Sequence, residues 1–210
     1  EGADHVAIDN EKAAREATEH LLGLGRRAIL VIGGRNDSGL GTAEARTRGY
    51  RAALAEAGIA YDPAALLPVE SFRMPDGAEA VARALSEGAR PDALLCLNDQ
   101  LALGALRTLH EHGVRVPDEV AVIGFDDVEA GRFSVPTLST VAPDKAAVAQ
   151  VAVELLQRRM DEATGSAPAD ASSAGVRSPQ DLVVAHRLVL RESTEGVTGP
   201  LPPRSRPGAS

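Results

Sequence analysis

Polar side chains follow four apolar runs of the sequence, each at the point where the run ends. Arginine donates hydrogen bonds, aspartate accepts them and asparagine does both, so such a set can grip vicinal hydroxyl groups. Arg46 lies about one turn into the helix predicted after the first run, from where its guanidinium can reach back. The polar groups are Arg35-Asn36-Asp37, Glu70-Ser71-Phe72, Asn98-Asp99 and Asp126-Asp127.

Each of these residues also has a structural interpretation. Asn98 or Asp99 could cap the helix that follows them, and Asp126-Asp127 could simply form a turn. An isolated arginine such as Arg46 usually lies on the surface, and Phe72 could belong to the core. Residue type alone leaves both interpretations open.

Other chemistries have little support in the sequence. The five histidines are scattered, and the single cysteine, Cys96, excludes an internal disulfide, so neither a metal nor a cofactor is expected. Gly33-Gly34 lacks the third glycine of a dinucleotide fingerprint. No phosphate-loop or Gly-x-Ser-x-Gly motif occurs. Only Asp126-Asp127 offers an adjacent carboxylate pair at these strand ends, and we do not expect an enzyme.

The elements that must position these side chains alternate between strand and helix. Apolar runs at 28–32, 66–69, 92–97 and 119–124 indicate strands, with a proline that favours an edge or end position in the second. Helical spacing follows Asp9-Asn10 and recurs at 43–57, 76–87 and 100–112, where Asp76 is expected to cap the third helix. The pattern predicts an α/β fold with a doubly wound parallel sheet. Ligands bind such sheets at the carboxyl ends of the strands.

Composition and charge narrow the function further. The chain has 210 residues, 44% of them hydrophobic, and a formal net charge of −8. An acidic chain lacks the basic face that phosphate binding needs, so these residues are not expected to bind DNA. No apolar run approaches the roughly 20 residues of a membrane span. The balance fits a cytosolic protein that handles small molecules.

Beyond Pro143 the organisation changes. A helix is expected at 144–160, with a broad apolar face that includes Val151, Leu155, Leu156 and Met160. Residues 164–179 are rich in Gly, Ser, Ala and Pro and indicate a linker. A last strand is expected at 186–191, followed by a disordered tail.

Several segments together resemble the LacI/GalR family of sugar-responsive repressors. They are residues 98–105 (NDQLALGA), 113–127 (GVRVPDEVAVIGFDD) and 136–141 (PTLSTV), flanked by Val6-x-x-Asp9-Asn10, Arg46-x-x-Gly49-Tyr50 and residues 188–194 (LVLREST). The resemblance runs from about His5 to Thr194 in the same order and with similar gaps. It departs from the family at Lys12-Ala13-Ala14, where a glycine is usual, and in a longer 164–179 linker.

The resemblance implies a type I periplasmic-binding-protein-like core, with two lobes and an effector in the cleft between them. It further implies an N-terminal helix-turn-helix for operator DNA and a homodimer formed through the core. By the family's motifs, Arg46, Asn98 and Asp126 correspond to effector contacts, and Phe72 to an aromatic beside the ligand. The helix from Gln100 and the stretch after Asp127 correspond to dimer surface.

The same resemblance suggests a division of the chain. Residues 1–141 are expected to be the C-terminal lobe, and 142–163 a return helix that belongs to the N-terminal lobe. A linker would occupy 164–184, the final strand 185–195 and the tail 196–210. The helix-turn-helix and the first strands of the N-terminal lobe are absent, so the sequence is interpreted as a fragment.

We therefore expect the effector-sensing region of a cytoplasmic LacI-type regulator, with a sugar as the effector. The alternative is a secreted sugar-binding protein of the same fold. The gene upstream of Glu1 distinguishes them, because a regulator would encode a helix-turn-helix there and a secreted protein a signal peptide.

Overall fold

The computed structural model describes residues 3–34, 41–164 and 178–196. Three sequence predictions lie outside these residues: the polar group Arg35-Asn36-Asp37, most of the 164–179 linker, and nearly all of the tail. Among the described residues, no helix is long and apolar enough to cross a membrane.

A six-stranded sheet forms the centre of the molecule, with the strand order β3-β2-β4-β5-β6-β8. All neighbours in it are parallel except β8, which pairs with β6 in the antiparallel direction. The predicted α/β fold with a parallel sheet is confirmed, and the proline-containing segment does provide an edge strand, β3. The strands are β2 Ile29–Ile32, β3 Leu66–Leu67, β4 Ala93–Cys96, β5 Ala121–Phe125, β6 Ser139–Pro143 and β8 His186–Val189.

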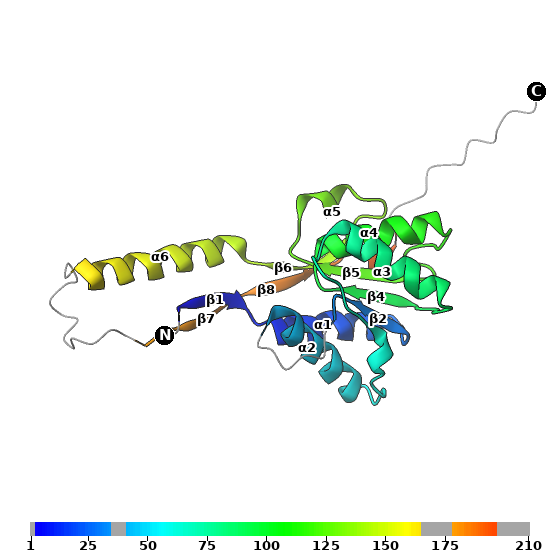
Figure 1. Ribbon diagram of the computed structural model, residues 1–210, viewed down its shortest axis with the longest axis horizontal. Helices are drawn as coiled ribbons and strands as arrows, with labels where there is room; N and C mark the ends of the chain where they lie inside the picture. The colour runs from blue at the N-terminus through cyan, green and yellow to red at the C-terminus, as the bar shows by residue number, and fades with distance from the viewer. Residues whose placement is uncertain (1–2, 35–40, 165–177, 197–210) are drawn as a thin grey trace, which may run out of the picture.

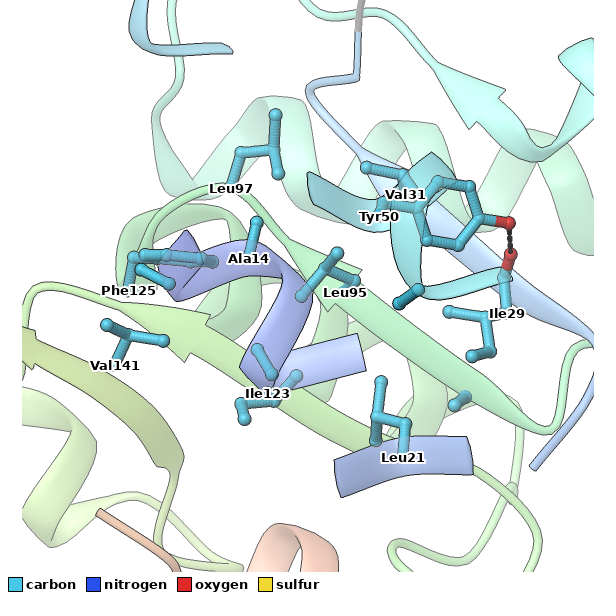
Figure 2. Packing of buried hydrophobic residues seen from close by; sticks show 14 of the residues in the cluster. Ala14, Leu21, Ile29, Val31, Tyr50, Leu95, Leu97, Ile123, Phe125 and Val141 are labelled. Carbon is cyan, nitrogen blue, oxygen red and sulfur yellow. Dashed lines mark hydrogen bonds between the residues drawn. The ribbon is translucent and has the colours of Figure 1, made fainter. Parts of the chain in front are cut away.

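Helices cover both faces of this sheet, because successive side chains of each strand point to opposite sides. Leu95 of β4 packs with the α1–α2 cluster, whereas its neighbour Leu94 packs with the α3–α4 cluster. Figure 2 shows the first cluster, in which the Tyr50 hydroxyl donates to the Ile29 carbonyl at 3.1 Å. The helices are α1 Asn10–Gly23, α2 Thr42–Glu56, α3 Met74–Ser86, α4 Asp99–Glu111, α5 Glu129–Phe133 and α7 Glu192–Glu195, with a short 3₁₀ turn at Pro63–Ala65.

Side-chain caps fix where the helices begin. Asp9 caps α1 by accepting a hydrogen bond from the Lys12 amide at 2.9 Å. The prediction that Asp76 caps α3 is wrong, because the helix begins two residues earlier at Met74. Asp76 instead lies in the first turn and accepts from the Arg73 amide at 2.8 Å.

Two glycines allow α3 and α4 to approach closely. A Cβ on Gly104 would lie 1.9 Å from the Met74 carbonyl oxygen, and one on Gly77 would lie 2.1 Å from the Leu101 oxygen. Each glycine therefore allows the backbone of the other helix to come closer than a side chain would permit.

A second, smaller region projects from the main sheet, and we call it the arm (Figure 1). It consists of β1 His5–Ile8, β7 Asp181–Val184 and α6 Lys145–Thr164. The two strands form a separate parallel sheet in which His5 pairs with Asp181. The arm joins the rest, the main lobe, through β6 and β8, whose ends meet at the Pro143–His186 pair.

The arm contains two strands that the sequence does not predict. Residues 181–184, which the sequence assigns to a linker, form β7, and His5–Ile8 form β1. The partners are about 176 residues apart, and local periodicity carries no trace of such a pairing.

Candidate functional site

A cleft of about 470 Å³ opens at the carboxyl ends of the parallel strands. It lies close to β2, which has β3 on one side and β4 on the other, so the strand order reverses there. Ligands usually bind at such a reversal in this fold. All four residues predicted to bind an effector line it. Among the described residues, the lining consists of Thr42, Ala43, Glu44, Arg46, Phe72, Leu97, Asn98 and Asp126.

Arg46 is the anchored cation of the cleft. It extends from the second turn of α2 and is only 8% exposed, so its interpretation as a surface arginine is wrong. Its Nε donates to Asn10 Oδ1 at 2.9 Å, and its Nη1 donates to the Leu97 carbonyl. Its Cζ lies 4.0 Å from the centroid of the Phe125 ring, a cation–π contact. These contacts fix the guanidinium in one orientation.

Asp126 supplies the matching acceptor. Its Oδ1 lies 3.9 Å from Arg46 Nη2, and its side chain is 43% exposed. Burial lowers the pKa of Arg46, while the negative charges of Asp126 and Asp99 act in the opposite direction. Arg46 and Asp126, which follow different strands in the sequence, therefore lie together at one edge of the sheet.

Both ends of the Asn98 side-chain amide form hydrogen bonds within the protein. Its Oδ1 caps α4 by accepting from the Leu101 amide at 2.8 Å, and its Nδ2 donates to the Phe72 carbonyl at 2.9 Å. The capping interpretation is thus confirmed. Any contact with a ligand would use the remaining lone pair or proton.

Phe72 forms an apolar wall beside these polar groups. Its backbone has a φ of 55°, a left-handed conformation that is uncommon for a residue with a side chain. The ring lies against Gly33, where an added Cβ would come within 2.8 Å of it. Phe72 is half-buried, so it belongs to the edge of the core and to the cleft at once.

Asp127 points away from the cleft, although it adjoins Asp126. Its Oδ1 accepts from Arg191 Nη2 at 2.6 Å, and its Oδ2 accepts from Arg132 Nη2 at 2.8 Å. Burial alone would raise the pKa of Asp127, but the two arginines outweigh it and hold that pKa below its ordinary value. The two aspartates therefore have different roles in one turn.

Two neighbours of the cleft were not predicted as site residues. Asn10 holds Arg46, and Asp99, next to Asn98, is a buried carboxylate beneath the turn that carries Asp126. The sequence does not indicate either role, because Asn10 and Asp99 could equally well be helix caps.

Of the other predicted polar residues at the strand ends, Ser71 has a structural contact. Ser71 donates to the Asp76 carboxylate at 2.7 Å and does not line the cleft. Cys96 is fully buried in β4, which raises the pKa of its thiol. No cluster of three or more His, Cys, Asp or Glu side chains in the described ranges could hold a metal ion.

Comparison with known proteins finds one family model that spans most of the chain. Residues 18–194 match the periplasmic binding protein-like domain. A putative transcriptional regulator of the LacI family from Sanguibacter keddieii has a similar structure, with 47% identity and a TM-score of 0.82 over 92% of this chain and 69% of that one. The complex of the transcriptional regulator CelR with cellobiose is 31% identical, with a TM-score of 0.77 over 91% and 54% of the two chains.

Curated proteins of similar sequence are also repressors. The transcriptional repressor PurR of Haemophilus influenzae is 33% identical over 86% of this chain, and the ribose operon repressor of the same species is 34% identical over 76%. These alignments cover 50% and 47% of the two repressors. The chain thus spans about half the length of the curated relatives it matches.

Proposed function

Because the chain belongs to the LacI family of transcriptional regulators, we propose that it senses a small effector on behalf of a DNA-binding protein. The observation that carries this proposal is the cleft in which the fixed Arg46 guanidinium faces the open Asp126 carboxylate. A binding role needs such complementary groups, whereas catalysis would need a nucleophile or an acid–base pair.

The effector is a neutral molecule rich in hydroxyl groups, and we propose a sugar. Arg46 and Asp126 offset each other's charge, and the Glu44 carboxylate also lines the cleft, so an anionic ligand would be repelled, whereas neutral hydroxyl groups can bond to all three. A hydroxyl group can accept from the guanidinium and donate to the carboxylate at the same time. The Phe72 ring offers an apolar surface for the C–H face of a sugar ring. The ribose operon repressor and the CelR–cellobiose complex are consistent with this class.

The remaining parts of the mechanism lie partly outside this chain. We propose that the arm belongs to a second lobe, that an effector bridging the lobes favours their closure, and that closure alters the spacing of DNA-binding heads. In this scheme the protein is a cytoplasmic homodimer, with α4 and the stretch after Asp127 at the dimer surface. Operator DNA is bound by an N-terminal domain, not by these residues, whose acidic balance opposes it.

Calorimetric titration of the full-length protein with mono- and disaccharides, including ribose and cellobiose, tests the proposal. We expect one of the sugars to bind and Asp126→Asn to weaken it at least tenfold, since one hydrogen bond to a charged group contributes about 1.5–3 kcal/mol. Glu87→Gln is the matched control, because Glu87 is an exposed carboxylate at the C-terminal end of α3 and does not line the cleft. Equal affinities of Asp126→Asn and the wild type would contradict the assignment. A signal peptide upstream of Glu1 would favour the secreted binding protein instead.

A further inference from the structure

Asp99 is a buried carboxylate for which effector contact gives no account. It is the first residue of α4 and is 1% exposed. No arginine, lysine or histidine in the described part of the chain forms an ion pair with it. Burying a charge without a cation is costly, so the position calls for a compensating role.

Both carboxylate oxygens are directed at the structure around the Asp126 turn. Oδ2 accepts from the Val128 amide at 2.8 Å, and Oδ1 accepts from the Thr140 hydroxyl on β6 at 2.7 Å. Thr140 Oγ1 in turn accepts from the Asp127 amide at 3.3 Å. A Cβ on Gly124 would lie 2.3 Å from Asp99 Oδ1, so the glycine leaves room for this carboxylate.

The turn needs such support because its backbone is strained. Asp126 has a φ of 102° and Asp127 a φ of 46°, both in the region that side-chain-bearing residues rarely adopt. One amide of the turn is held by the sheet, since Asp126 N donates to the Val141 carbonyl at 2.8 Å. The amides of Asp127 and Val128 both depend on Asp99, the first of them through Thr140.

We propose that Asp99 is a positioning residue, which holds the 126–128 turn in the conformation that points Asp126 into the cleft. Asp99 holds the turn through its two acceptor oxygens and the shape of its side chain. Asparagine can reproduce both bonds, since its oxygen can accept from Val128 while its amide donates to Thr140. Leucine has a similar size but can make neither bond. The inference rests on the proposed function only where it concerns effector affinity.

Amide hydrogen exchange in the 210-residue chain tests the proposal without a ligand. In Asp99→Leu we expect the Val128 amide to exchange at least tenfold faster, while the Leu101 amide, capped by Asn98, keeps its rate. Asp99→Asn should restore Val128 protection to within threefold of the wild type. Unchanged Val128 protection in a folded Asp99→Leu variant would overturn the proposal, and so would equal acceleration of both amides. Where Asp99→Leu does not fold, Thr140→Val decides in the same way through the Asp127 amide.

Effector affinity in the full-length protein is the second measurement, made with the sugar found in the titration above. Asp99→Leu should weaken it about tenfold and Asp99→Asn by less than threefold. Unchanged affinity in Asp99→Leu would overturn the positioning role. A wild-type protein that binds none of the sugars would refute the proposed function alone, because the exchange result still decides whether Asp99 holds the turn.

Discussion

The main lobe and the arm treat their apolar side chains in opposite ways. In the main lobe every residue of β4 and β5 is buried, with helices on both faces. In α6 only Leu155 is buried, while Leu156 and Met160 are 60% and 58% exposed. The main lobe therefore closes its own core, whereas the arm leaves large apolar side chains of α6 exposed. Of the broad apolar face predicted for this helix, Leu155 packs inward, while Leu156 and Met160 are not covered by the described part of the chain.

A carboxylate next to the arm and one in the main lobe have pKa values that are shifted in opposite directions. In the arm, Asp4 accepts two hydrogen bonds from Arg159, at 2.7 and 2.8 Å, and these lower its pKa to about 2. In the main lobe, burial raises the pKa of Asp99 to about 7, against the effect of its hydrogen bonds and with that of Asp126 and Asp127. An arginine therefore stabilises the charged form of Asp4 at the periphery, whereas burial disfavours the charged form of Asp99 beneath the cleft.

Truncation of one leucine in each region should give the largest contrast. Leu95→Ala in the main lobe is expected to lower the free energy of unfolding by about 3–4 kcal/mol, because it leaves a cavity in a closed core. Leu156→Ala in α6 should cost less than about 0.5 kcal/mol, since that side chain is already in water. Urea unfolding of the two variants, at concentrations low enough to keep the chain monomeric, measures both values. Similar losses under these conditions would contradict the exposure of Leu156.

The pH dependence of stability should separate the two carboxylates. The folded pKa of Asp99, about 7, exceeds the value near 3.9 of an unfolded chain, so its stabilising contribution is complete below pH 4 and is lost as the pH rises to 7. For Asp4 the folded pKa is about 2, so its contribution is present above pH 4 and is lost as the pH falls through 2.

Urea unfolding from pH 5 to 8 checks the sign for Asp99. The wild type should lose up to roughly 3 kcal/mol relative to Asp99→Asn over this range, because the variant cannot ionise there. Arg159→Met, which removes the partner of Asp4, should leave this slope unchanged. Parallel curves for the wild type and Asp99→Asn would contradict the raised pKa.

Glycine substitutions should show where helices touch. Gly104→Ala is expected to cost about 2 kcal/mol, because its Cβ would overlap the Met74 carbonyl of α3. Gly23→Ala, at the end of α1, meets nothing within 4 Å and should stabilise the chain by up to about 0.5 kcal/mol. Thermal unfolding of the pair measures the difference. A neutral Gly104→Ala would show that α3 and α4 can separate without loss.

Polar substitutions on the exposed face of α6 should have the smallest effect on stability, but they should change the oligomeric state. An uncovered apolar face should drive association, so light scattering of the purified chain should give a mass above that of a monomer. Leu156→Gln combined with Met160→Gln should reduce this mass while changing unfolding by less than about 0.5 kcal/mol. A monodisperse wild-type monomer with α6 ordered would contradict this expectation.

Local sequence patterns were enough to locate β2, β3, β4, β5 and β8, the helices α1 to α4 and the residues that meet at the cleft, but not β6 or α5. Apolar runs and caps are local properties, and parallel strands necessarily bring their carboxyl ends to one edge. Arg46 and Asp126 could therefore be paired without a structure. Tertiary structure decided what depends on distant contacts: the β1–β7 pairing and the uncovered arm. It also turned Asp127 toward Arg191, away from the cleft, and placed Asp99 under the turn. A side chain's direction at a turn follows from backbone angles and partners far along the chain, which no local pattern encodes.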